Sequence, residues 1–426
     1  MAYTILFGTF AFLMLLGMPI AFCLGIASFA TVLYLGIPPI VIFQQLNSGM
    51  NVFAMMAIPF FIFAGDLMVR GGIAYRLVRF ASGFVGHLRG GLGQVNIVSS
   101  TLFGGISGSA VADASAIGGL MVPQMAARGY DRGYAVNVTI SSALIALMIP
   151  PSHNMILYSI SAGGTVSVAD LFTAGIIPGM LLTIALMVTA YIVARRKGYP
   201  AEPFPGIGKL VVFFFAALPG LLLIAIIFGG VRSGVFTATE SSCIAVIYAF
   251  LVAVLVYREL DWSGFVEAIL GAVKTTSLVL LVIGMAAAFA WLMSFLQVQL
   301  TLIQLVRSIS DNPMVVLLLI TVALLVLGTF MDMAPLVIIT TPVFLPIVKA
   351  FGIDPVHFGV IMILNAGIGL ITPPVGTVLF VGCAVGKITI REAMETIWPF
   401  FGACVAVLMM VTFIPELSLW LPAQFK

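Results

Sequence analysis

The sequence predicts an all-α, polytopic membrane protein that consists of two inverted repeats, and three observations lead to this prediction. Of its 426 residues, 62% are hydrophobic and only 8% are charged, with a mean hydropathy of +1.24, whereas a soluble domain carries about 25% charged residues. Apolar runs of about 20 residues, long enough to span a bilayer as helices, recur from end to end. Two such runs are interrupted by Pro150-Pro151 and Pro373-Pro374, which are 223 positions apart.

The offset of 223 positions also aligns the sequence around these breaks, without a gap, over about sixty residues. The further identical pairs are Gly105 and Gly328, Pro123 and Pro346, Ala127 and Ala350, Gly129 and Gly352, Asp131 and Asp354, and Gly163 and Gly386. A proline inside a helix removes a backbone donor and frees a carbonyl, and at membrane depth such groups persist only inside protein or beside a cavity. Paired breaks at equivalent points of two repeats therefore indicate the substrate and ion site of a transporter.

The elements of the first half are expected in the following order. Its first 35 residues form either one long tilted helix or two short helices that turn at Gly17-Met18-Pro19, and the offset, which aligns 13–34 with 236–257, favours two. Further helices are predicted near 52–69 and 168–194, a re-entrant segment near 91–125, and a broken helix near 132–162.

The second half repeats this order after a polar linker rich in proline and glycine, residues 195–209. Helices are predicted near 210–231, 236–257, 274–300 and 394–421, a re-entrant segment near 313–348, and a broken helix near 356–386. Five crossings in each half is an odd number, so the second repeat is expected to be inverted in the membrane relative to the first.

The positive charges support this topology. If the linker is cytoplasmic, four of the 18 Lys and Arg residues lie outside, namely Arg232, Arg307, Lys349 and Lys426, and the other fourteen lie inside. This distribution is the positive-inside bias of membrane proteins, and it places both termini outside. Because the charges are confined to loops, the net charge of +3 indicates no charged partner, and we expect contact with membrane lipid but not with nucleic acid.

The re-entrant segments are predicted from two polar tips in otherwise apolar sequence. The first tip reads FGGISGSAVAD (103–113) and the second reads LGTFMDM (327–333). Glycine permits an unwound tip, where free amides and carbonyls can bind ligands. A single cluster of this kind would more simply be a small-residue surface for helix packing. Two clusters at equivalent repeat positions, each followed by a Pro-Pro break, favour binding tips.

Acidic residues inside apolar segments are a second sign of a binding site, since a charge at the bilayer centre costs about 2.5–3.5 kcal/mol on insertion scales. Asp113 and Asp332 follow the two tips, and for Asp113 the capping of a helix N-terminus is as reasonable as site chemistry. Asp66 is expected to cap a helix or to snorkel. His153, after the first Pro-Pro pair, either contacts substrate or is a hydrogen-bonded interior histidine. The four cysteines show neither disulfide nor metal-ligand spacing, so no cofactor and no metal site other than one for sodium is expected.

Together these motifs resemble the large membrane subunit of tripartite ATP-independent periplasmic (TRAP) transporters. The segments that carry the resemblance are LFGGISGSAVAD (102–113), IPFFIFAGD (58–66), GHLRGG (86–91), IPPS (149–152) and ITPPVG (371–376). The resemblance extends over essentially the whole chain, and the combination of motifs is specific.

The resemblance implies a sodium-coupled importer of organic acids in the bacterial inner membrane, which works with a small four-helix membrane subunit and a periplasmic substrate-binding protein. It also implies an elevator mechanism, in which a transport domain slides against a scaffold. The expected divisions are scaffold helices and an interfacial arm helix of repeat 1 (1–90), transport-domain half 1 with its hairpin and broken helix (91–162), a scaffold helix and the cytoplasmic linker (163–209), scaffold helices and the arm of repeat 2 (210–312), transport-domain half 2 (313–386), and a terminal helix (387–426).

Sodium is a hard cation that prefers oxygen ligands, which the tips and breaks can supply. The first sodium site is expected at Gly105, Ser107, Gly108, Ser109, Ile149 and Pro150. The second is expected at Gly328, Thr329, Met331, Gly369 and Thr372. Helix N-termini are expected to bind the substrate carboxylate between these sites. The polar groups expected on the substrate side are Ser109, Asp113, Asn154, Asp332, Asn365 and Thr377.

Other function classes fit the sequence less well. The main alternative is a stand-alone sodium/carboxylate symporter that needs no binding protein. An ATP-driven permease would need a separate ATPase subunit, because GCAVGKI (382–388) lacks the spacing of a phosphate loop. An intramembrane enzyme is disfavoured by the lack of paired acids on one helix, of a His-Glu-x-x-His motif and of a Ser/His pair with an evident partner. A channel is disfavoured because two dead-end hairpins suit occlusion better than a continuous pore.

The substrate is not settled by the sequence. The family that the chain resembles handles mono- and dicarboxylates, including C4-dicarboxylates, as well as keto acids and sialic acids. Overall resemblance favours a sugar acid such as sialic acid.

Overall fold

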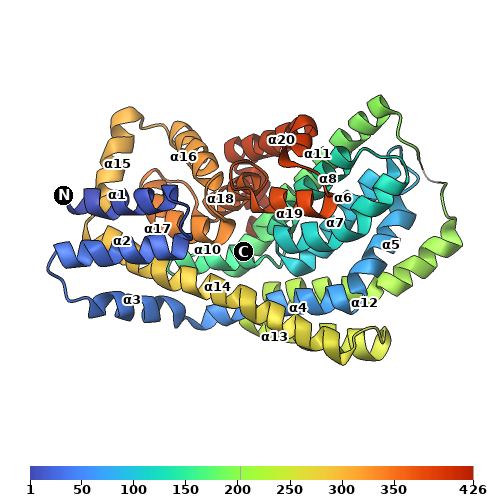
Figure 1. Cartoon of the computed structure of the whole chain (residues 1–426), viewed down its shortest axis with the longest axis horizontal. Coiled ribbons are helices and arrows are strands. Elements are labelled where there is room, and N and C mark those ends of the chain that lie inside the picture. Colours follow the sequence, from blue (N-terminus) through green and yellow to red (C-terminus); the bar gives the residue numbers. More distant parts are fainter. Residues whose placement is uncertain (202, 426) are drawn as a thin grey trace.

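The computed structural model describes residues 1–201 and 203–425, and over these residues the protein is helical without a strand (Figure 1). Within the described chain, seven helices are long and apolar enough to cross a membrane, or up to nine if each of two bent helix pairs is one span. An all-α, polytopic architecture is thereby confirmed. Residue 202 of the predicted linker and residue 426 of the predicted terminal segment lie outside the described residues.

The first repeat runs from α1 to α11. Its helices are α1 (Ala2–Leu15), α2 (Ile20–Tyr34), α3 (Ile40–Met50), α4 (Ala57–Arg70), α5 (Ile73–Val85), α6 (Gly91–Ser107), α7 (Ala110–Ala127), α8 (Arg132–Ser142), α9 (Ile145–Met148), α10 (His153–Ser161) and α11 (Val168–Lys197). A 3-10 turn, Phe53–Met56, precedes α4. The first 35 residues form two helices, as the repeat offset favoured, and the chain turns between them at Gly17, whose φ of +78° suits glycine.

The second repeat runs from α12 to α21. Its helices are α12 (Ile207–Arg232), α13 (Ala238–Leu251), α14 (Trp262–Phe295), α15 (Val298–Ile309), α16 (Pro313–Gly328), α17 (Met333–Ala350), α18 (Pro355–Leu370), α19 (Thr377–Gly386), α20 (Ile390–Phe413) and α21 (Glu416–Ala423). A π-helical turn, Val252–Val256, extends α13. The predicted helix near 394–421 is split, because Pro415 disfavours helical geometry at the residue before it.

The offset of 223 positions relates the elements as well as the sequences. Added to the bounds of α7 it gives 333–350, which are the bounds of α17, and added to α10 it gives 376–384, which falls on α19. It also aligns α5 with α15, since the bounds of α5 become 296–308. The repeats differ at one place, because α3 and α4 are separate helices whereas their counterpart α14 is continuous over 34 residues.

Contacts between the halves follow the same two-fold relation. Helix α7 of the first repeat packs against α19 of the second, and their counterparts α17 and α10 also pack together. Likewise α8 contacts α20, and α18 contacts α11. Reciprocal contacts of this kind are what a pseudo-two-fold axis between repeats produces.

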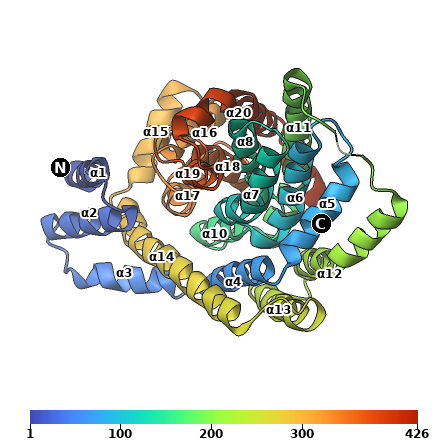
Figure 2. The ribbon, with the colours of Figure 1, turned by 45° about the vertical axis from the view of Figure 1, so that its right-hand side comes forward.

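The helices form two groups that lie side by side in both views (Figures 1 and 2). In the first group, α14 runs along α2, α3 and α4, while α13 packs on α4, and α12 packs on α5. The second group contains the helical hairpins α6–α7 and α16–α17 together with α8–α10 and α18–α20. Helix α11, which the sequence assigned to the scaffold, packs against α6, α9, α18 and α20, so by its contacts it belongs with the second group.

Candidate functional site

The tip of hairpin α6–α7 packs tightly against the break between α9 and α10. Gly108 has a left-handed φ of +57°, and a Cβ built on it would lie 2.7 Å from the Pro151 carbonyl oxygen. A Cβ on Gly105 would lie 3.1 Å from Ile149 Cγ2 and 3.4 Å from the Pro150 carbonyl oxygen. Glycine is required because backbone approaches backbone here. The structure therefore brings together the tip and the break that were predicted to share the first sodium site.

Two buried hydroxyl groups at this junction have no hydrogen-bond partner. Ser107 at the tip is 3% exposed and Ser152 after the break is fully buried, and both Oγ atoms lack a partner. Such groups cost free energy unless something binds them. The hydroxyl of Ser109, by contrast, accepts a hydrogen bond from the Ala112 amide at 3.3 Å and caps α7. Asn154 of α10 donates to the Gly108 carbonyl at 3.4 Å and ties the break to the tip.

The second tip meets the second break in the same way. A Cβ on Gly369 would lie 2.7 Å from the carbonyl oxygen of Gly328, so the two glycines are in backbone contact. The Val375 amide donates to the Thr329 carbonyl at 3.0 Å. The Thr377 hydroxyl donates to Asp332 at 3.0 Å.

The remaining predicted residues of the second site lie within or beside this junction. Met331 is buried in the tip. The hydroxyl of Thr372 donates to its own helix, at the Ile368 carbonyl, at 2.7 Å.

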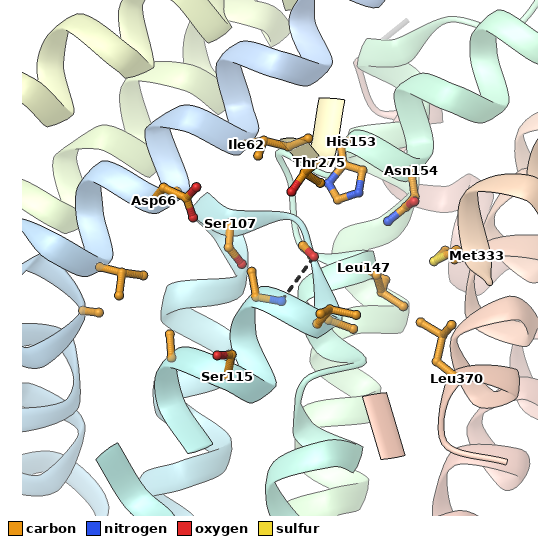
Figure 3. A pocket seen from close by; sticks show the side chains of 18 of the residues that line it. Ile62, Asp66, Ser107, Ser115, Leu147, His153, Asn154, Thr275, Met333 and Leu370 are labelled. Atoms are coloured by element: carbon orange, nitrogen blue, oxygen red, sulfur yellow. Dashed lines mark hydrogen bonds between the residues drawn. The ribbon is translucent and has the colours of Figure 1, made fainter. Parts of the chain in front are cut away.

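A cavity of about 800 Å³ separates the two helix groups at the first tip, a volume in the range of small-molecule sites. Figure 3 shows Asp66 and Ile62 of α4 on one wall, Ser107 at the tip, and His153 and Asn154 at the start of α10. The N-terminal residues of three helices line it: α7, α10 and α17. Helix N-termini carry partial positive charge and attract anions.

Charged groups at the cavity belong mainly to its α4 wall. Asp66 and Arg70 lie on α4, and Arg70, the only Lys or Arg among the described lining residues, forms an ion pair with Glu267 at 2.5 Å. Asp332 lies at the start of α17. An anionic ligand would therefore meet helix N-termini and uncharged polar groups in the part of the cavity near the tip.

Three of the predicted substrate residues line the cavity, and three do not. Ser109, Asn154 and Asp332 are lining residues. Asn365 is fully buried and donates to the Thr321 carbonyl at 2.8 Å, and Thr377, which donates to Asp332, is not a lining residue. Asp113 is fully buried and is not a lining residue, although its neighbours Ala112 and Ser115 are. The substrate roles of these six residues stay predictions.

Some lining residues were not assigned from the sequence. His153, for which the sequence left open substrate contact or the role of a hydrogen-bonded interior histidine, lines the cavity, and its Nδ1 has no hydrogen-bond partner. Ser152 is fully buried beside the cavity-lining residue His153 and is not itself a lining residue, but its place directly after a Pro-Pro pair could have identified it. Asp66 and Thr275 enter the cavity wall through packing between helices far apart in sequence, for which the sequence contains no local signal.

The comparisons with known proteins agree on one family. The sequence model described as "Tripartite ATP-independent periplasmic transporter, DctM component" matches residues 7–417. The chain is 46% identical to the uncharacterized protein YgiK of Salmonella typhimurium over 99% of this chain and 97% of that protein. It is 38% identical to the 2,3-diketo-L-gulonate TRAP transporter large permease protein YiaN of Escherichia coli, over 94% of both chains.

A further relative is the sialic acid TRAP transporter large permease protein SiaM of Vibrio cholerae, which is 38% identical over 97% of this chain and 96% of that protein. Among solved structures, the YdaH transporter of Alcanivorax borkumensis shares the fold, with a TM-score of 0.56, 14% identity, and coverage of 89% of this chain and 87% of that one. Large permeases are membrane components of secondary transporters for organic acids, not enzymes, and act with a small membrane subunit and a periplasmic binding protein. The chain belongs to the family of the DctM component, the large permease, of tripartite ATP-independent periplasmic transporters.

Proposed function

We propose that this large permease is a sodium-coupled importer that takes an organic acid from a periplasmic binding protein across the bacterial inner membrane. The observation that carries the proposal is the pair of buried, unpartnered hydroxyls, Ser107 and Ser152, where the first tip meets the first break. Sodium is bound by oxygen ligands, and these serines flank the junction where Gly105 and Gly108 approach the carbonyls of Pro150 and Pro151. The second tip and break, with Thr329 and Thr372, supply the second proposed sodium site.

The cavity supports an elevator mechanism. It lies between the two helix groups and reaches from the first tip to Arg70 and Tyr75 at the ends of α4 and α5, which the positive-inside rule places on the cytoplasmic side. In the proposed cycle the hairpin group, with α8–α11 and α18–α20, is the moving transport domain. The group around α14 is the scaffold. The present conformation is then the inward-facing one, and both chain termini are periplasmic.

For the substrate we propose a carboxylate bound at the N-termini of α7 and α10. Uncharged polar groups of the cavity, including Asn154 and His153, would bind hydroxyl or keto oxygens, which suits a sugar acid. Sialic acid is the first compound to test. A thermal-shift screen of the partner binding protein against sugar acids, keto acids and C4-dicarboxylates identifies the class.

Uptake by proteoliposomes that contain both membrane subunits, with the binding protein outside, tests the sodium coupling. We expect uptake to require an inward sodium gradient and to rise with more than first-order dependence on sodium. Ser107→Ala should weaken the sodium dependence, while Ser99→Ala should not. Ser99 is a suitable control because it lies on the same helix, is equally buried and also lacks a hydrogen-bond partner, but is two turns from the tip. Full uptake with potassium or with a proton gradient alone would contradict the proposal.

A further inference from the structure

The buried carboxylate of Asp113 has no cationic partner among the described residues. The residue is fully buried in the first turn of α7, and neither carboxylate oxygen has a hydrogen-bond partner. No ion pair within the described residues includes it. Removing an unpaired carboxylate from water carries a large free-energy cost, and the dipole at the start of α7 offsets only a part of it. A folded protein therefore needs a cation or a proton at this carboxylate.

The surroundings of Asp113 are polar and are built from three helices. The Ser100 hydroxyl of α6 faces the carboxylate without reaching hydrogen-bond geometry. Behind it, Ser142 Oγ of α8 lies 3.1 Å from Ser100 Oγ. Asn96 of α6 donates to the Thr139 hydroxyl at 2.7 Å. These residues are all fully buried, and with Asp113 we call them the Asp113 cluster.

The second repeat shows that the fold does not need this cluster. At the offset of 223 positions, the counterparts of its members are mostly apolar. Asp113 corresponds to Leu336, Ser100 to Ala323, Asn96 to Leu319 and Thr139 to Met362, while Ser142 corresponds to Asn365. Leu336 is fully buried in the equivalent hairpin helix, α17. Because the same helices pack without an acid in the second repeat, the acid in the first repeat indicates a bound ligand and not a packing requirement.

We propose that the Asp113 cluster binds a third sodium ion, in addition to the two at the tips, and that this ion is transported with the substrate. The proposal rests on the sodium coupling proposed above. Carboxylate and hydroxyl oxygens are hard ligands of the kind that bind such cations, and here they come from Asp113 and Ser100. The Asp113 amide donates to the Ser109 carbonyl at 2.9 Å, so this site lies one helical turn beyond the first tip. It moves with the first hairpin.

The equilibrium accumulation of substrate tests the proposal, because it depends on how many ions are coupled and not on how fast the protein works. At zero membrane potential and with a tenfold sodium gradient, each coupled sodium multiplies the accumulation ratio by about ten. Asp113→Asn and Asp113→Leu, the second copying the other repeat, should therefore accumulate about tenfold less than wild type. The control Asp131→Asn alters an acid of the same repeat outside the membrane segments and should match wild type.

Radioactive sodium bound per purified protein gives a second readout, which also applies if a variant does not transport. Both Asp113 variants should bind one sodium ion fewer than wild type. Equal sodium counts and equal accumulation ratios in wild type and variants would overturn the third site. So would variants that keep the sodium count but lose a dependence on the pH gradient, because Asp113 would then carry a proton. If wild type shows no sodium dependence, the proposed function itself fails, and this result is distinct from both.

Discussion

Gly108→Ala tests whether contact between the first tip and the first break forms an ion site. The left-handed backbone of Gly108 costs an alanine about 1–2 kcal/mol. In addition, the new Cβ would lie 2.7 Å from the Pro151 carbonyl oxygen, where real contacts of a Cβ are essentially never under 3.0 Å. The break must therefore move away by several tenths of an ångström. A displacement of this size approaches the roughly 0.5 Å tolerance of a preorganised binding site.

Gly163→Ala is the matched control. Gly163 also has a left-handed φ, of +69°, but nothing lies within 4 Å of the position of its Cβ. Both variants should therefore lose about 1–2 kcal/mol of stability from backbone strain. Only Gly108→Ala also moves the carbonyls of the break.

Thermal unfolding of the purified membrane complex in sodium chloride and in choline chloride distinguishes the two effects. We expect sodium to stabilise wild type and Gly163→Ala by the same increment, since a ligand that binds only the folded state stabilises it. Gly108→Ala should lose most of this increment and most of its sodium-driven uptake. Equal sodium increments in Gly108→Ala and Gly163→Ala would refute the assignment of the first site.

Three further outcomes are expected. Gly369→Ala should reduce the sodium response as Gly108→Ala does, because the new Cβ would meet the Gly328 backbone. Gly402→Ala has open space around its Cβ and should not reduce it. Sodium titration of uptake measures the response of both variants. Lys197 donates to Asp131 at 2.8 Å and lowers the pKa of that carboxyl. The ion pair therefore stabilises the fold at pH values above the ordinary pKa of aspartate, and this stabilisation is lost as the pH falls through the lowered pKa. In unfolding measurements, Lys197→Ala should reduce the free energy of unfolding by up to about 1 kcal/mol at pH 7 and by less below pH 4. Uptake of free substrate without the binding protein should be negligible, and robust uptake would instead identify a stand-alone symporter.

The arrangement of tips and breaks could be predicted from the sequence because its signals are local. Glycine clusters and Pro-Pro pairs disfavour regular helix, and the offset of 223 positions relates the first tip to the second and the first break to the second. The expectation that each tip meets the break of its own repeat agrees with the tip–break contacts at Gly108 and Gly369. The α4 wall of the cavity, with Asp66 and Thr275, depends on how distant helices pack, which no local pattern encodes.

Local sequence patterns also did not predict which of the polar residues are buried. Asp113 ends the first tip and Asn154 follows the first break, yet Asp113 is enclosed among α6, α7 and α8, whereas Asn154 lines the cavity. Which side of a helix meets its neighbours is decided by tertiary contacts. Helix ends were predicted less well than helix existence, and α14 begins at Trp262, twelve residues before the predicted start.

The continuous helix α14 makes the two repeats mechanically unequal. Its 34 residues form a rod about 51 Å long, which exceeds the roughly 30 Å hydrocarbon core of a bilayer, so α14 either tilts or extends beyond the core. It touches α3 and α4 of one repeat and α17 of the other, and therefore acts as a brace between walls on either side of the cavity. Packing against these neighbours, and not the length of the apolar stretch alone, sets the tilt of such a rod. Because α14 contacts both walls, a change in its tilt moves the two walls relative to each other.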